Sequence, residues 1–150
     1  MVNSNGATLA ITLPVPANLG TVPSGTLTLS APLGAVTVSA SGLLVPGFVA
    51  TVTSTDFTTG SGLPAQTIPK ADISYWSGLL IMYSGGQTAV PGQASAMFAQ
   101  PLSAPVTAFT STGLLLVFSI STTWIPTIVI AIPPAAVAGT YTGTITHSVA

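Results

Sequence analysis

The sequence predicts an all-β protein, an immunoglobulin-like antiparallel β-sandwich of about eight to ten short strands in one domain spanning residues 1–150. Valine, isoleucine and threonine, which favour strands, are abundant along the chain. Fifteen glycines and 13 prolines supply turns at short intervals, and no segment shows the periodicity of an amphipathic helix. A chain of 150 residues can bury a core without disulfides or metal.

The first predicted strand spans Thr8–Val15 and follows a segment, residues 1–7, that we expect to be flexible or extended. Apolar residues alternate with small or polar ones along it, as in a strand with one buried face. Pro14 and Pro16 confine such a strand to a sheet edge. It is therefore a candidate assembly strand, either an edge strand of its own domain or a strand donated to a neighbouring subunit. Its apolar face consists of Leu9, Ile11, Leu13 and Val15.

Further short strands are predicted between turns that contain glycine or proline. They span residues 26–30, 36–39, 48–55, 73–76, 79–83, 87–90, 106–110 and 114–120. Gly85-Gly86 favours a two-residue hairpin turn, because glycine accepts positive φ angles at both positions. Residues 94–98 are compatible with a strand or with a loose connection.

Two segments near the C-terminus predict the centre of the sandwich. Thr123–Pro133 is an apolar, β-branched run bounded by prolines, which indicates a strand buried on both faces, with Trp124 between the sheets. Gly139–Ala150 alternates, as a strand with one buried face does. The link Pro133–Gly139 is expected to return the chain so that the two strands pair antiparallel.

Charge is almost absent from this chain. Lys70, Asp56 and Asp72 are the only charged side chains, 2% of the sequence, whereas about 25% is usual in soluble domains. A net charge of −1 gives little repulsion between copies. Without a basic patch, nucleic acids and anionic membrane surfaces are poor partners. Such a surface suits a protein that packs against copies of itself or that carries glycans.

Residues 114–132 form an uncharged stretch nearly as long as a membrane span. Ser119, Ser121 and Pro126 interrupt it, and two strands fit better than one helix, so we expect no transmembrane segment. Met1–Asn5 has neither the basic start nor the apolar core of a signal peptide, which leaves a cytoplasmic protein or one whose leader has been removed. Cysteine is absent, so no disulfide framework is expected.

Ionisable groups are too few for most catalytic sites. His147 is the only histidine, and Asp56 and Asp72 are the only carboxylate side chains. No nucleophile elbow, calcium-binding loop or P-loop accompanies them. We therefore expect no enzymatic activity, catalytic residue, cofactor or metal site. The aspartates are expected in turns, bonded to backbone amides, with Lys70 nearby on the surface.

Tyr75 and Trp76 are neighbours in one predicted strand, so their side chains point to opposite faces of its sheet. We expect one of them to be exposed or to lie in a contact with a partner. Together with Tyr83 and Trp124 they could form a sugar-binding platform, since aromatic faces stack on sugar rings. Core packing is the competing interpretation for each of them.

Five segments carry a resemblance to a known family. They are Phe48–Gly60, Thr67–Pro69, Ile73–Tyr75, Trp124–Thr127 and Ala138–Thr146. Their order resembles the WxL-like, immunoglobulin-like domains of secreted surface proteins in Gram-positive bacteria, particularly actinobacteria. The resemblance extends from Leu9 to the C-terminus. It implies a β-sandwich, an extracellular location at the cell surface and attachment to the cell wall.

These observations together predict a non-enzymatic, extracellular structural protein that assembles with copies of itself. A filament, sheath or surface layer would be held by β-strand and apolar contacts, so its assembly should respond little to salt. The alternative is a secreted adhesion or carbohydrate-binding module that contacts cell-wall glycan through Trp76 and neighbouring aromatic residues. The size of the particles in dilute buffer distinguishes the two.

Overall fold

The computed structural model describes residues 8–14, 18–41, 47–84, 88–112 and 119–150. Strands predominate in these ranges, and every strand pair is antiparallel. The predicted all-β sandwich is confirmed. The predictions for residues 1–7, Val15, the Gly85-Gly86 turn and residues 114–118 lie outside the described residues.

Fourteen strands and three short 3₁₀ turns occur in the described ranges. In chain order the strands are β1 (Thr8–Thr12), β2 (Thr28–Pro32), β3 (Val36–Ser41), β4 (Phe48–Ser54), β5 (Phe57–Thr58), β6 (Thr67–Ile68), β7 (Ile73–Trp76), β8 (Leu80–Ser84), β9 (Thr88–Pro91), β10 (Gln100–Pro101), β11 (Val106–Thr112), β12 (Ser119–Trp124), β13 (Thr127–Ala131) and β14 (Ile145–Val149). The turns are η1 (Pro64–Gln66), η2 (Lys70–Asp72) and η3 (Ala96–Phe98).

Two four-stranded groups, β1-β3-β12-β8 and β10-β7-β13-β2, are connected by three chain segments, each of which contributes one strand to each group. β2 leads into β3, β7 into β8 and β12 into β13, and we call the two groups together the split sheet. The interruptions contain Gly34 and Gly78, which have φ angles of 93° and 72°, and Pro126, which lacks an N–H group. Two of the interruptions are hydrogen-bonded to each other, since the backbone N–H of Leu33 donates to the carbonyl of Pro126 at 2.9 Å. The three interruptions, together with the two-residue strands β5, β6 and β10, raise the strand number above the predicted eight to ten.

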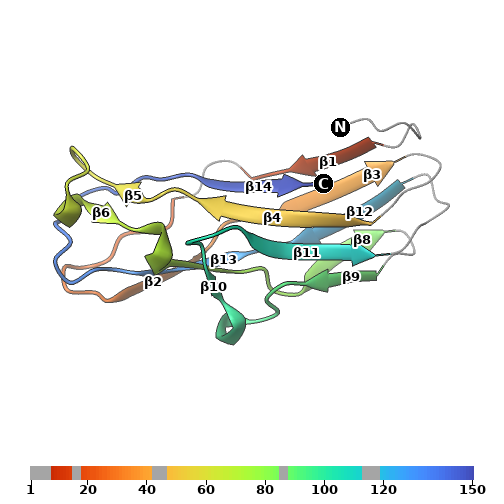
Figure 1. Ribbon diagram of the computed structural model, residues 1–150. Helices are drawn as coiled ribbons and strands as arrows, with labels where there is room; N and C mark the ends of the chain where they lie inside the picture. The colour runs from red at the N-terminus through yellow and green to blue at the C-terminus, as the bar shows by residue number, and fades with distance from the viewer. Residues whose placement is uncertain (1–7, 15–17, 42–46, 85–87, 113–118) are drawn as a thin grey trace.

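The front sheet, β14-β4-β11-β9, covers the split sheet (Figure 1). Its β4 buries alternate residues, as β3 does in the split sheet, so the inward side chains of both layers meet in one core. The rings of Phe109 and Trp124 join the layers, with centroids 4.8 Å apart. Trp124 is fully buried, as predicted. At the two margins, β1 lies next to β14 and β8 next to β9.

Two predictions for the C-terminal segments are wrong. β13 buries Ile128 and Ile130, but Val129 on its other face is only half-buried. A chain with so few charged residues also uses apolar residues on outer faces, so an apolar run does not indicate two-sided burial here.

The predicted pairing of these two segments does not occur either, because β13 belongs to the split sheet and β14 to the front sheet. Residues 132–144 cross between them. The crossing segment bonds to the β5–β6 end of the domain, where the N–H of Val137 donates to the carbonyl of Ala65 at 2.9 Å. The alternation predicted for the last strand is present in β14, where His147 is buried.

Candidate functional site

The predicted assembly strand lies at a sheet edge of its own chain. β1 pairs with β3, placing Leu9 opposite Ala40 and Ile11 opposite Val38. Leu9 and Ile11 are half-buried against the core. Leu13 is exposed beyond the end of the strand, and Val15 lies outside the described residues. The structure thus gives the edge-strand arrangement within one chain.

A second edge of the split sheet is more apolar. β8 pairs with β12 and ends the strand order of its group. The consecutive residues Ile81, Met82 and Tyr83 are all exposed, so both faces of β8 are open to solvent. We call the exposed set around this strand the apolar edge. It consists of Leu79, Ile81, Met82, Tyr83 and Val90, the last from the neighbouring β9.

A strand was predicted at residues 79–83, with Tyr83 as a candidate for the sugar-binding platform, but no assembly role was predicted for it. Its signal was five hydrophobic residues in a row after Gly78, Leu79–Tyr83, without the alternation of a half-buried strand. In a charge-poor chain, that pattern also describes a buried strand. Only the sheet order reveals that β8 is an edge.

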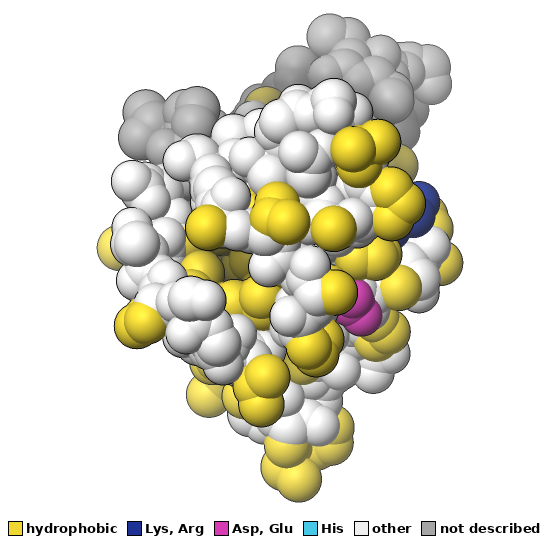
Figure 2. Space-filling view, turned by 90° about the vertical axis from the view of Figure 1, so that its left-hand side faces the viewer, with side chains coloured by type: hydrophobic (Ala, Val, Ile, Leu, Met, Phe, Trp, Pro, Cys, Tyr) yellow, Lys and Arg dark blue, Asp and Glu magenta, His cyan; other side chains and the backbone are white. Residues whose placement is uncertain are grey.

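The charged residues lie elsewhere. Asp56 precedes β5, while Lys70 and Asp72 are in η2, and β8 and β9 lie toward the opposite end of the domain (Figure 1). Figure 2 shows the end that carries β5 and β6, where hydrophobic and uncharged polar side chains mix and the visible basic and acidic side chains lie on the same half of the face. The Asp56 carboxylate accepts a hydrogen bond from the backbone N–H of Lys70 at 2.8 Å. The predicted proximity is present, but this contact uses the backbone of Lys70 rather than its ammonium group.

Lys70→Ala should therefore change the free energy of unfolding by less than about 1 kcal/mol, because the substitution keeps the backbone N–H and removes an exposed charge. Asp56→Ala should cost about 1 kcal/mol through the lost hydrogen bond. Urea denaturation of both variants measures the difference. A larger loss for Lys70→Ala would contradict the expectation and place its ammonium group in a desolvated contact.

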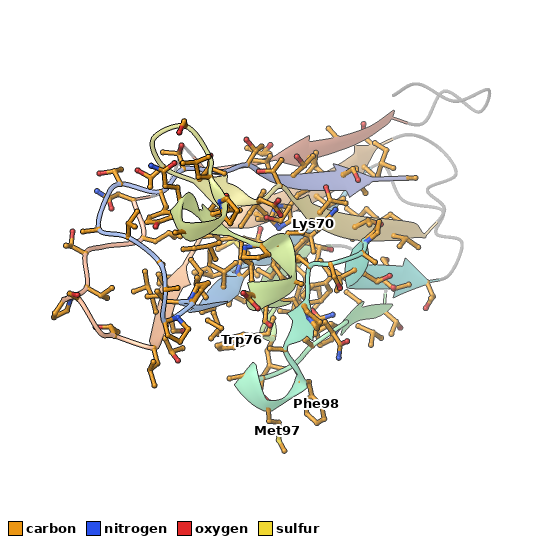
Figure 3. All side chains as sticks on the ribbon, turned by 60° about the vertical axis from the view of Figure 1, so that its left-hand side comes forward. Lys70, Trp76, Met97 and Phe98 are labelled. Atoms are coloured by element: carbon orange, nitrogen blue, oxygen red, sulfur yellow. The ribbon has the colours of Figure 1, made fainter. Side chains whose placement is uncertain are left out.

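Tyr75 and Trp76 face opposite ways, as predicted. Tyr75 is fully buried in the core, whereas Trp76 lies half-buried on the outer face of β7. The Nε1–H of Trp76 is buried without a hydrogen-bond partner. Below it, Met97 and Phe98 project from η3 into solvent (Figure 3). Since Tyr75 and Trp124 are buried, neither can stack on a sugar.

A buried chain of hydrogen bonds joins three strands from both layers. The indole N–H of Trp124 in β12 donates to the hydroxyl of Tyr75 in β7, at 3.1 Å. That hydroxyl lies 3.0 Å from Nε2 of His147 in β14. The indole can only donate, so the Tyr75 hydroxyl accepts from it and keeps its own proton available for Nε2. In that arrangement Nε2 is the acceptor, which corresponds to the neutral imidazole with its proton on Nδ1.

Burial supports the same protonation states. It lowers the pKa of His147 to about 4, and it raises the pKa of Tyr75 while the hydrogen bond from Trp124 lowers it to a smaller extent. Neither group is poised to exchange protons near neutral pH. His147 was predicted to lie in a strand without a catalytic role, and its hydrogen bond to Tyr75 was not predicted. The alternation in each strand indicates that residues 75, 124 and 147 point inward. It does not show that the three side chains meet, because that depends on how the strands are placed relative to one another.

Among the described residues, no group of three histidine, cysteine or acidic side chains is placed to hold a metal ion. Within the same ranges no helix has the length and apolar character needed to cross a bilayer. No family model, curated protein or solved structure matches the chain.

Proposed function

We propose that this chain is a non-enzymatic structural subunit that assembles with copies of itself through strand edges and apolar contacts. The observation that carries the proposal is the apolar edge, a sheet margin without charged residues or proline in β8 on an almost uncharged surface. Natural proteins usually block such margins with lysine, glutamate or proline. β8, with the sequence Leu-Ile-Met-Tyr-Ser, has none of these.

Association with a second copy would bury exposed apolar surface and provide hydrogen-bond partners for an edge strand. Burying exposed apolar surface is favourable by roughly 25 cal/mol per Å². Unpaired backbone groups of an edge strand gain partners when another strand is added. With three charged side chains in the whole sequence, little electrostatic repulsion opposes the approach of a second copy.

Placement outside the cell, as a filament, sheath or surface-layer subunit, belongs to the same proposal. It is supported by the order of segments that resembles secreted actinobacterial surface proteins, and it stays a prediction. The alternative, adhesion to cell-wall glycan, depends on aromatic side chains that reach the surface. Of the four aromatic residues considered, Tyr83 is exposed and Trp76 is half-buried.

Assembly should be nearly independent of ionic strength. Raising salt from about 0.01 M to about 1 M shortens the Debye length from about 30 Å to about 3 Å, which abolishes charge steering but leaves apolar contacts intact. Sedimentation velocity and electron microscopy at both conditions should show the same large particles. A monodisperse monomer at high protein concentration in both would overturn the proposal.

A further inference from the structure

Among the strands that the structure describes, β8 pairs only with β12, and its nearest neighbour beyond that pair is β9 of the front sheet. β8 ends its strand order, and three successive side chains are exposed on its two faces. One common defence of edges is present, a shift of register where β8 passes Thr123 and Trp124. Charged residues and proline, the other defences, are missing from the strand.

We propose that β8 pairs with β8 of a second copy, antiparallel about a two-fold axis at Met82, so that the split sheets of two subunits become continuous. The inference rests on the proposed function and names one of its contacts. Met82 is the middle residue of β8, so this register uses the whole strand. Ile81 of each copy then lies opposite Tyr83 of the other, a β-branched and aromatic pair of the kind that stabilises antiparallel strands.

The chemistry of the edge selects a second copy as the occupant. A charged partner strand would lose hydration against the apolar edge without meeting any opposite charge, since Lys70, Asp56 and Asp72 lie near β5 and β6. An uncharged, apolar strand meets no such cost, and β8 is itself one. A two-fold contact also requires a self-complementary surface, which an antiparallel strand pair provides.

The exposed apolar area sets the size of a contact between copies. The five side chains of the apolar edge are each between 51% and 67% exposed. At this exposure a large apolar side chain offers on the order of 100 Å², or about 500 Å² for the set. Two copies would bury at most roughly 1,000 Å² through these side chains, which is near the size at which stable biological interfaces begin, and the added backbone hydrogen bonds contribute the rest of the contact.

A two-fold contact closes at a dimer, so larger particles need another interface. β1 is the opposite margin of the same strand group, β1-β3-β12-β8. Contacts at both margins would extend the split sheet from subunit to subunit. Blocking β8 should therefore reduce assemblies to smaller units held by the remaining contact.

Disulfide trapping tests the register directly, because the sequence contains no cysteine and an introduced one is the only thiol. On the two-fold axis, Met82→Cys meets its own copy at a Cβ separation of about 4.5–5.5 Å, which small adjustments bring into disulfide range. Leu27→Cys is the matched control, because Leu27 and Met82 are both 67% exposed. Under mild oxidation Met82→Cys should form a covalent dimer at least about tenfold faster than Leu27→Cys. Equal rates would overturn the proposal.

Met82→Lys tests the contact through assembly. Two lysines facing each other on the axis should weaken association about tenfold or more, whereas Leu27→Lys should leave it unchanged. Circular dichroism and urea denaturation should show the same fold for both, since both side chains are exposed. If Met82→Lys does not fold, the trapping rates decide.

The two proposals fail in different ways. A wild-type protein that stays monomeric removes the proposed function, and the β8 contact with it. A wild-type protein that assembles, while both lysine variants assemble equally and both cysteine variants react equally, removes only the β8 contact.

Discussion

Trp124→Ala should cost about 3–5 kcal/mol in the free energy of unfolding and leave little folded protein. The indole is fully buried and packs on the ring of Phe109, so its loss leaves a cavity where the two layers meet. It also removes the donor to the Tyr75 hydroxyl. Both effects act on the same buried position, which has no access to water.

Trp76→Ala is the matched control for this substitution, since it deletes the same side chain from the outer face. Because Trp76 is only half-buried, its loss should cost less than about 2 kcal/mol. Trp124→Phe keeps most of the ring and loses the N–H, so it should cost about 1 kcal/mol for the hydrogen bond in addition to the packing change. Urea denaturation followed by circular dichroism ranks the three. Equal losses for the two alanine variants would contradict the placement of Trp124 as the centre of the core.

Acidification should remove about 3 kcal/mol of stability between pH 6.5 and pH 4, through His147 alone. Burial lowers the pKa of His147 to about 4 in the folded protein, against about 6.5 in the unfolded chain. Below pH 6.5 the unfolded chain therefore binds the proton more readily, and stability falls until the folded state also binds it near pH 4. Above pH 6.5 the contribution is fully present.

Burial is the reason that the folded protein resists this proton, because an imidazolium in the core would lose its hydration. Protonation would also turn Nε2 into a donor toward the Tyr75 hydroxyl, the same oxygen that accepts from Trp124. The hydroxyl proton would then lose its acceptor in a dry site. No charged group contributes to the shift at His147, so no carboxylate is placed to stabilise an imidazolium there.

His147→Gln is the control for the acid response, because its carbonyl oxygen can accept from Tyr75 and does not titrate. The urea midpoint of the wild type should fall across this pH range, and that of the variant should stay nearly flat. Parallel curves for the two proteins would show that another group is responsible.

The fold class could be predicted from the sequence because apolar and polar residues alternate along individual strands, such as β3 and β4, and alternate residues are buried in the structure. Trp124 was placed in the core, and Tyr75 and Trp76 on opposite faces, from local pattern alone. Pairing partners were not accessible in this way. The Thr123–Pro133 and Gly139–Ala150 segments are near neighbours in sequence, yet their strands belong to different sheets because residues 132–144 bond to the β5–β6 end instead.

The candidate site was predictable only in part, for a related reason. Prolines beside the first strand indicated an edge, and β1 is one. Nothing comparable accompanies β8, whose apolar residues have the same composition as core strands elsewhere in the chain. In most proteins charge separates outer faces from inner ones. With 2% charged residues that contrast is missing, and only the sheet order identifies the exposed strand.

The long separations between paired strands also affect the order of folding events. The hydroxyls of Thr37 in β3 and Thr123 in β12 lie 2.8 Å apart although 86 positions separate them in the chain. Such pairings require large loops to close before any contact forms, which slows folding of all-β domains to milliseconds or seconds. During that interval β3 lacks β12, and β4 lacks both β11 and β14. Nascent copies therefore expose more unpaired strands than finished ones, and local protein concentration decides whether these strands find their own chain or a neighbour's.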